Sequence, residues 1–169
     1  MKVSVTSKKL LHVRAVGIVI KDNQILVMHR KKEGKEYWVF PGGGVEEGES
    51  SRNATVREVK EETNLQITVT RLLYQHHLTN TLGVKLRQDF YLCELIGGKL
   101  GLRDDSIEKK MMAESNQLYE PLWFPLSGIK QLLLYPLEIR DWLMADLKNG
   151  FPAEPRVANF RIEDLRQTL

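Results

Sequence analysis

Runs of apolar residues separated by short polar turns predict a chain rich in β-strands. Apolar and β-branched residues dominate positions 13–20, a polar turn follows at Lys21-Asp22-Asn23, and apolar residues return at 24–28. Two such runs around a short polar turn are typical of a β-hairpin. The chain therefore opens with two strands, after an amino-terminal segment that is polar and basic.

A second pair of strands is predicted at 67–74 and 84–95, on either side of a turn at 80–83. In the later strand, apolar Val84, Leu86, Phe90 and Leu92 alternate with polar or charged residues, Tyr91 among them. Such alternation indicates a strand with one side in the core and one side in solvent.

Between these strand pairs, residues 50–63 have the pattern of an amphipathic helix. Ser50 or Ser51 supplies a capping oxygen, and no proline interrupts the following dozen residues. One stripe is expected to face the core, because its members recur at helical spacing. That stripe consists of Thr55, Val56, Val59 and Thr63.

The second half of the chain predicts a long polar connection and two further helices. Residues 97–117 are polar, and a connection of this length is usually functional or mobile. A strand is expected at 119–126, followed by a helix capped by Ser127 with Ile129, Leu132 and Leu133 facing inward. The last helix is predicted from Pro136, as its first residue, to about Lys148, with Gly150 as terminator.

The helix at 50–63 follows a glycine-rich loop and carries a cluster of acidic residues. Gly42-Gly43-Gly44 begins the loop, and Glu58, Glu61 and Glu62 lie at i, i+3 and i+4 of the helix. Like charges at this spacing repel by about 0.2–0.5 kcal/mol per pair, and bound divalent cations would relieve that repulsion. Ligands that are all oxygen suit Mg²⁺ or Mn²⁺.

This stretch resembles the Nudix box, the signature of the Nudix hydrolases, over Gly43 to Leu65. The signature is Gly, five residues, Glu, seven residues, Arg-Glu, an aliphatic, any residue, Glu-Glu, any residue, Gly and an aliphatic. Its counterparts in this chain are Gly43, Glu49, Arg57, Glu58, Val59, Glu61, Glu62, Asn64 and Leu65. Asn64 replaces the usual glycine just past the helix end, where asparagine is the next-best residue for a left-handed backbone.

The resemblance also extends upstream of the box. Trp38-Val39-Phe40-Pro41-Gly42-Gly43 matches the Trp-x-Phe-Pro-Gly-Gly run that leads into the box in Nudix sequences. Arg30, at the end of the second predicted strand, is a candidate phosphate clamp, because a guanidinium binds phosphate oxygens in pairs. The alternative for Arg30 is a solvated strand end.

The resemblance implies an α/β (α+β) fold in which a mixed β-sheet lies between α-helices, and a metal site in the box. It implies Glu58 and Glu62 as direct metal ligands, Glu61 as a direct or water-mediated ligand, and the carbonyl of Gly42 or Gly43 as a backbone ligand. Gly43 and Gly44 would let the backbone approach metal and phosphate, and Arg57 would pair with Glu49. A further carboxylate is expected from Asp104, Asp105, Glu108 or Glu114, without a choice among them.

Composition favours a single domain at 1–150 with an extension at 151–169 that packs on the domain or on a partner subunit, so a homodimer stays open. The chain has 169 residues, 42% of them hydrophobic, and a net charge of +3 without a basic cluster. A single cysteine, Cys93, excludes an intrachain disulfide and favours a reducing compartment. No apolar run reaches membrane length. We therefore expect a soluble cytoplasmic protein with no membrane partner.

Three functions fit these residues. The first is an enzyme that uses Mg²⁺, or Mn²⁺, to hydrolyse the diphosphate linkage of a nucleoside triphosphate, nucleotide sugar or dinucleoside polyphosphate. The second is a module that binds a nucleotide without cleaving it, although such a module would not need all three glutamates. The third is removal of pyrophosphate from RNA 5′ ends, against which the lack of a basic and aromatic stripe argues.

Overall fold

The computed structural model describes residues 11–161 except 81, 103, 106 and 116, and it describes the backbone but not the side chain of Glu108 and Arg161. Strands dominate this part of the chain, and three α-helices and one 3₁₀ helix (η1) join them. The elements are β1 (Leu11–Lys21), β2 (Gln24–Lys32), β3 (Lys35–Val39), β4 (Gly42–Gly44), α1 (Ser51–Thr63), β5 (Leu65–Thr79), β6 (Lys85–Gly98), α2 (Ile107–Glu114), β7 (Leu118–Pro125), η1 (Leu126–Gln131), β8 (Leu134–Tyr135), α3 (Leu137–Asn149) and β9 (Arg156–Arg161).

The predicted amino-terminal hairpin is confirmed as β1 and β2. Asp22 and Asn23 form its turn with positive φ angles of 49° and 58°, a conformation that Asp and Asn tolerate well. The two strands pair only next to this turn, at Ile20 with Ile25 and Lys21 with Gln24. Beyond these pairs β1 and β2 have different neighbours. The glycine-rich loop that begins at Gly42, called the box loop below, uses this separation, because its strand β4 pairs with β1.

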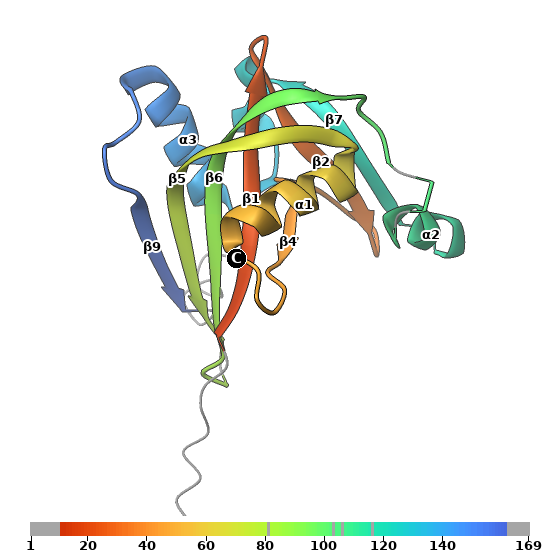
Figure 1. The fold of residues 1–169 in the computed structure, drawn as a ribbon, viewed down its shortest axis with the longest axis horizontal. Coiled ribbons are helices and arrows are strands. Elements are labelled where there is room, and N and C mark those ends of the chain that lie inside the picture. Colours follow the sequence, from red (N-terminus) through yellow and green to blue (C-terminus); the bar gives the residue numbers. More distant parts are fainter. Residues whose placement is uncertain (1–10, 81, 103, 106, 116, 162–169) are drawn as a thin grey trace, which may run out of the picture.

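The sheet is mixed, as the resemblance implied. Its strand order is β8-β3-β2-β1-β6-β5-β9, with β4 paired to β1 and β7 paired to β2. The β1–β6 pair is parallel, whereas β5 and β6 form the predicted second antiparallel pair around the turn after Asn80. Figure 1 shows β6 and β5 beside β1, with α1 lying across them.

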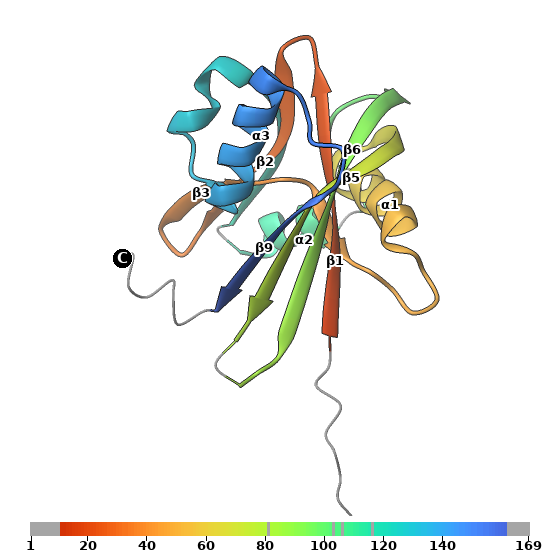
Figure 2. The same ribbon diagram turned by 90° about the vertical axis from the view of Figure 1, so that its left-hand side faces the viewer.

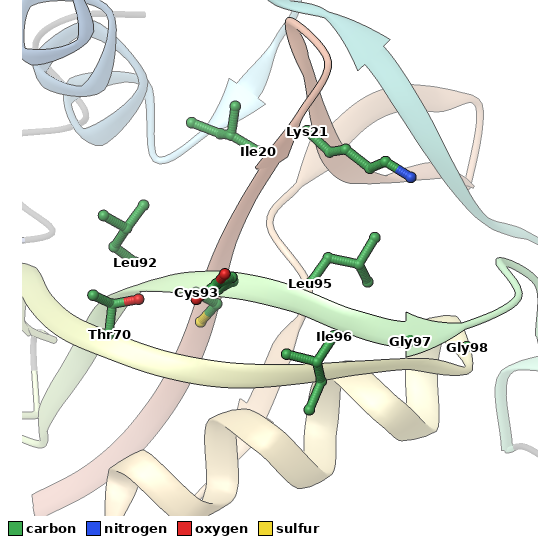
Figure 3. Close-up of a pocket in the computed structure, with 10 residues that line it drawn as sticks. Ile20, Lys21, Thr70, Leu92, Cys93, Leu95, Ile96, Gly97 and Gly98 are labelled. Atoms are coloured by element: carbon green, nitrogen blue, oxygen red, sulfur yellow. The ribbon is translucent and has the colours of Figure 1, made fainter.

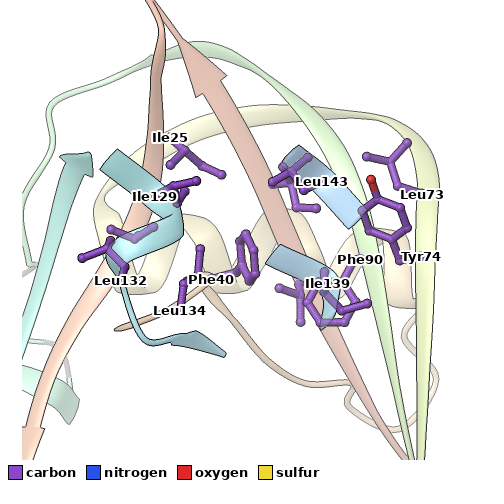
Figure 4. Packing of buried hydrophobic residues seen from close by; sticks show 13 residues of the cluster. Ile25, Phe40, Leu73, Tyr74, Phe90, Ile129, Leu132, Leu134, Ile139 and Leu143 are labelled. Carbon is purple, nitrogen blue, oxygen red and sulfur yellow. The ribbon is translucent and has the colours of Figure 1, made fainter. Parts of the chain in front are cut away.

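Helices cover the strands β1, β6 and β5 from opposite sides (Figure 2). On one side, Ile139 and Leu143 of α3 pack near Phe90 of β6 (Figure 4), in the larger core cluster that also includes Ile18 of β1. On the other side, Val59 of α1 packs in a second cluster that includes Val19. Successive strand residues point to opposite faces, so β1 contributes to both clusters.

Helix α1 has the predicted ends. Ser50 is the N-cap, and its side chain accepts a hydrogen bond from the Asn53 N–H at 3.1 Å. Asn64 has φ of 60° in the left-handed region, as expected for the residue that replaces the usual glycine. The predicted core stripe is wrong at Val56, which is 36% exposed, while Ala54 is fully buried. Because α1 packs against β4 as well as against β1 and β5, its buried arc is turned towards Ala54.

The predicted solvent-facing side of β6 is wrong at Asp89, whereas Lys85 is exposed as expected. Asp89 is only 2% exposed, and polar side chains of β5 and β6 surround its carboxylate. Its carboxylate accepts a hydrogen bond from Gln75 Nε2 at 2.9 Å and one from Arg87 Nη2 at 3.1 Å. The Asp89 carboxylate is therefore satisfied by hydrogen bonds within the protein, where the alternating pattern had predicted contact with water.

Two predictions for the second half of the chain need correction. The connection at 97–117 contains α2, which packs against the predicted strand β7. Ser127 does not cap a helix, because η1 already begins at Leu126, whose N–H donates to the Asn23 carbonyl at 2.9 Å. Ile129 and Leu132 are buried as predicted, whereas Leu133 is 47% exposed.

The last helix and the carboxy-terminal strand complete the fold. Helix α3 ends at Gly150 as predicted, and Pro136 is its N-cap instead of its first residue. Strand β9 pairs in parallel with β5, so residues 156–161 lie against the domain. Asp146 of α3 fixes this arrangement, because it accepts hydrogen bonds from Tyr74 of β5 at 2.8 Å and from Arg156 of β9 at 2.6 Å. The boundary at 150 stays a prediction.

Candidate active site

Arg57 joins the box loop to helix α1. Its Nε donates to Glu49 Oε1 at 3.0 Å, and its Nη2 donates to Glu49 Oε2 and to the Gly44 carbonyl, both at 2.9 Å. This two-pronged ion pair is the predicted Arg57–Glu49 contact, and it is confirmed. The guanidinium lowers the pKa of the Glu49 carboxyl by hydrogen bonding, and Glu49 in turn raises the pKa of Arg57. The pair holds the loop against the helix in its ionised form.

The same arginine also gathers the box carboxylates. Its Nη1 donates to Glu58 Oε1 at 2.8 Å and to Glu61 Oε2 at 3.3 Å. Glu62 Oε2 accepts a hydrogen bond from the Gly42 N–H at 2.8 Å, so it faces β4. Glu58 and Glu62 therefore lie beside β4, and Arg57 neutralises part of the charge of Glu58 and Glu61.

Glu58 is more enclosed than Glu61. Its side chain is 15% exposed, against 49% for Glu61. Burial raises the pKa of Glu58, while its hydrogen bond to Arg57 acts in the opposite direction. A Cβ at Gly43 would lie 2.3 Å from Glu58 Cδ, so a side chain at this position would displace the carboxylate. The Glu58 carboxylate can therefore occupy this position only because residue 43 has no side chain.

The donor atoms suit a hard divalent cation. Carboxylate oxygens of Glu58, Glu61 and Glu62 and backbone carbonyls of β4 are the oxygen ligands that Mg²⁺ and Mn²⁺ prefer. Within the described part of the chain, no three His, Cys, Asp or Glu side chains already converge in metal-binding geometry. Ligation requires carboxylate rotation, and the exposed Glu61 has the space for it.

Arg30 does not extend into solvent at the end of β2, which was the alternative to a phosphate clamp. Its guanidinium lies 4.2 Å from the centre of the Tyr119 ring and 5.7 Å from that of Tyr37, and it donates a hydrogen bond to the Tyr119 hydroxyl. The Arg30 Nε atom is buried without a hydrogen-bond partner among the described residues. These contacts fix the side chain between two aromatic rings.

The loop carboxylates are only partly described. Asp104 is exposed and accepts a hydrogen bond from Lys109. Asp105 also lies on the exposed surface, and Glu114 ends α2. The Glu108 side chain lies outside the described residues. The choice of an additional metal ligand or base among these four stays a prediction.

Sequence reasoning missed Arg14, which the fold brings to the site. It is the only charged residue within the apolar run 13–20, and this interruption was the available signal. In the sheet Arg14 lies opposite Gly44, and its Nη2 donates to the Gly42 carbonyl at 3.0 Å.

A cavity of about 640 Å³ lies at another part of the sheet (Figure 3). Ile20, Leu92, Leu95 and Ile96 line it, together with Cys93, whose pKa burial raises to about 12. None of the box glutamates lines this cavity. It is therefore distinct from the carboxylate cluster, and its thiol is protonated near neutral pH.

Comparisons with known proteins agree with this geometry. The model of the NUDIX domain matches residues 11–143. An ADP-ribose pyrophosphatase from Methanocaldococcus jannaschii is 40% identical over 103 residues, which are 59% of this chain and 60% of that protein. An RNA pyrophosphohydrolase from Haemophilus influenzae is 35% identical over 96 residues, 48% of this chain and 49% of that protein. The alignments thus span about half to three fifths of these relatives.

Solved structures show the same fold. The solution structure of the E. coli ORF135 protein superposes with a TM-score of 0.65 at 23% identity and covers 85% of this chain and 95% of that one. A NUDIX hydrolase from Nitrosomonas europaea gives a TM-score of 0.64 at 17% identity and covers 88% and 79% of the two chains. No described helix is long and apolar enough to cross a bilayer. The box, the mixed sheet between helices and the match over residues 11–143 together show that this chain belongs to the Nudix family.

Proposed function

We propose that the protein is a divalent-metal-dependent pyrophosphohydrolase that cleaves the diphosphate linkage of a small nucleoside diphosphate derivative. One observation carries the proposal: Glu58 and Glu62 lie against β4, Glu58 at Gly43 and Glu62 on the Gly42 N–H, and Glu61 shares Arg57 with Glu58. On an acidic helix face that only contacts solvent, water would hydrate the carboxylates and these contacts would not be expected. Both relatives named above carry names of enzymes that act on pyrophosphate bonds.

In this proposal Glu58, Glu61 and Glu62 hold Mg²⁺, or Mn²⁺, together with the Gly42 carbonyl. When bound, the ion neutralises phosphate charge and lowers the pKa of water so that hydroxide forms near neutral pH. The protein supplies position and shape. Arg57 and Glu49 fix the loop, and the absence of side chains at Gly43 and Gly44 lets the phosphates approach the backbone.

Arg30 is the proposed contact for the remote part of the substrate. Its position between Tyr37 and Tyr119 gives a planar cation beside aromatic rings, where a phosphate or a base edge can bind. The aromatic contacts restrict its rotamers, so less side-chain entropy is lost on binding.

We place a nucleotide sugar such as ADP-ribose first among the substrates, because the relative with that name matches the larger share of this chain. RNA with a 5′ triphosphate is the second candidate, since another relative carries that name. A net charge of +3, with scattered lysine and arginine, supports the small nucleotide. The single Cys93 supports a reducing, cytoplasmic location.

The test compares wild type with Glu62→Gln, which removes a ligand charge but keeps the side-chain shape. Both proteins are incubated with Mg²⁺ and, separately, ADP-ribose, canonical and oxidised nucleoside triphosphates, dinucleoside polyphosphates and triphosphorylated RNA, and products are separated by chromatography. For the compound that wild type cleaves, we expect kcat to fall at least about a hundredfold in the variant.

Glu154→Gln is the matched control, because Glu154 is exposed and lies outside the box. It makes the same chemical change, and its turnover should equal that of wild type. Near-normal turnover by Glu62→Gln would refute the assigned role of Glu62. Tight nucleotide binding without product, measured by calorimetry, would instead support a binding module. Unchanged RNA ends alongside cleavage of ADP-ribose would exclude the RNA candidate.

A further inference from the structure

Arg14 occupies the edge of the carboxylate cluster but belongs to no part of the box. Its Nη2 donates to the Gly42 carbonyl at 3.0 Å, while the N–H of the same glycine donates to Glu62 Oε2 at 2.8 Å. The carbonyl of Gly42 therefore contacts the cationic Arg14 side chain, and its N–H contacts the anionic Glu62 side chain. The Arg14 side chain is exposed, whereas the next residues of β1, Ala15 and Val16, are buried. The β1–β4 pairing fixes its backbone, and its exposed side chain leaves room for another rotamer.

The guanidinium takes the place that a cation would take in this site. A carbonyl oxygen that accepts from Arg14 has its lone pair directed at a positive charge, and the same oxygen is the proposed backbone ligand of the divalent ion. Ligation by oxygen requires a distance of about 2.0–2.1 Å for Mg²⁺, so both cations would lie within a few ångströms of each other. Their repulsion makes the Arg14 hydrogen bond and ligation of the ion compete for the Gly42 carbonyl.

Once a nucleotide is bound, its diphosphate oxygens lie within reach of an Arg14 side chain that has left the Gly42 carbonyl. A diphosphate that binds at Glu58 and Glu62 brings several anionic oxygens next to β4, and Arg14 lies opposite Gly44 in the β1–β4 pair. Guanidinium groups bind phosphate oxygens in pairs with charge-assisted hydrogen bonds. Phosphate is a stronger partner for the arginine than a neutral backbone carbonyl.

We propose that Arg14 is a substrate-binding residue that holds the Gly42 carbonyl and transfers to the diphosphate when a divalent ion and a nucleotide bind. The inference rests on the proposed function. It extends that function by a residue outside the box, and it predicts opposite effects of Arg14 on the binding of metal and of nucleotide.

The experiment titrates Arg14→Ala and wild type by calorimetry, first with Mn²⁺ alone and then with ADP at saturating Mn²⁺. Without the competing guanidinium, Mn²⁺ alone should bind the variant about threefold to tenfold more tightly than wild type. ADP should bind the variant at least about tenfold more weakly, because a charge-assisted pair with phosphate is lost. Arg14→Lys keeps the charge but not the paired donors, so its affinity for ADP should fall between the two.

Arg52→Ala is the control. Arg52 also donates to backbone carbonyls, those of Val69 and Thr70, but from the part of α1 that faces β5. Its loss removes one positive charge and should leave both affinities as in wild type. Circular dichroism before each titration establishes that the variants are folded, and Arg14→Lys serves as the test variant if Arg14→Ala is not.

A structural role for Arg14 would weaken both Mn²⁺ and ADP binding, and that result would overturn the inference. Equal ADP affinity in wild type and Arg14→Ala would overturn it as well. If wild type binds no Mn²⁺, the proposed function itself fails and the inference fails with it. Mn²⁺ binding by wild type that is unchanged in Arg14→Ala refutes only the role of Arg14.

Discussion

Three consecutive glycines in β4 serve different purposes. A Cβ at Gly42 would lie 2.3 Å from the Ala15 carbonyl oxygen, which is backbone and cannot move aside. A Cβ at Gly43 would instead meet the end of the flexible Glu58 side chain, and a Cβ at Gly44 would meet no atom within 4 Å. The first glycine is therefore required for packing, and the second for the place of a carboxylate.

We predict that Gly43→Ala folds normally but binds Mn²⁺ at least about tenfold more weakly, because its methyl group expels the Glu58 carboxylate. Calorimetry measures the affinity, and thermal unfolding measures the stability.

Gly42→Ala should lower the melting temperature by several degrees, since the overlap with the β1 backbone costs on the order of 2 kcal/mol. Gly44→Ala is the stability control and should melt with wild type. Normal Mn²⁺ affinity in Gly43→Ala would contradict the role assigned to Gly43.

At the scale of elements, Asp146 connects α3 to β5 and β9. Its carboxylate is 2% exposed and accepts from both Tyr74 and Arg156. Burial, followed by the hydrogen bond to Asp146, raises the pKa of Tyr74, so the phenol stays protonated and continues to donate. These two bonds hold the carboxy-terminal strand in register with the helix.

We predict that Asp146→Ala destabilises the protein by about 3 kcal/mol, because it leaves a buried hydroxyl and a partly buried guanidinium without their acceptor. Urea unfolding measures the difference. Asp141→Ala is the matched control on the same helix: Asp141 is 58% exposed and pairs with the adjacent Arg140, so its loss should change the stability by less than about 0.5 kcal/mol. Equal midpoints for the two variants would show that the Asp146 contacts contribute nothing.

At the scale of the whole molecule, the separation of β1 from β2 determines where the site lies. Strand β1 runs with β6 and β4, and β2 runs with β3 and β7. The box loop returns to β1 beside β4, where the Val45 N–H donates to the Val13 carbonyl at 3.0 Å. Glu58 and Glu62 of α1 thus face β4 while the apolar side of the helix covers the sheet.

The carboxy-terminal strand belongs to this arrangement. Ala158 of β9 is 5% exposed, the Phe160 ring lies 4.9 Å from that of His76, and Phe151 packs against the larger core cluster. We predict that a chain truncated after Gly150 loses at least about 3 kcal/mol of stability in urea unfolding, since it loses this apolar burial and the Arg156 pair. An unchanged urea midpoint would instead support an independent domain at 1–150 and a dispensable extension.

Local patterns in the sequence were sufficient for most of the elements. The hairpin turn at Asp22-Asn23, the Ser50 cap and the left-handed Asn64 follow from the conformations that these residue types prefer. The fold class was expected from the resemblance, and the structure agrees. The metal site at the box glutamates stays a prediction. Burial at Val56 and Asp89 was not predictable locally, because it depends on which neighbours cover each residue.

By itself, the sequence determined the longer strands, the acidic helix and the family, since each depends on residue types at fixed spacing along the chain, whereas α2 and the short strands β3, β4 and β8 were not predicted. The tertiary structure alone decided which distant residues share the site. Arg14 reaches Gly42 across 28 positions of sequence, and Arg30 meets Tyr119 across 89, because β1 pairs with β4 and β2 pairs with β7. Contacts between such distant positions depend on which strands pair and in which register, and burial of one face of the sheet fixes that register.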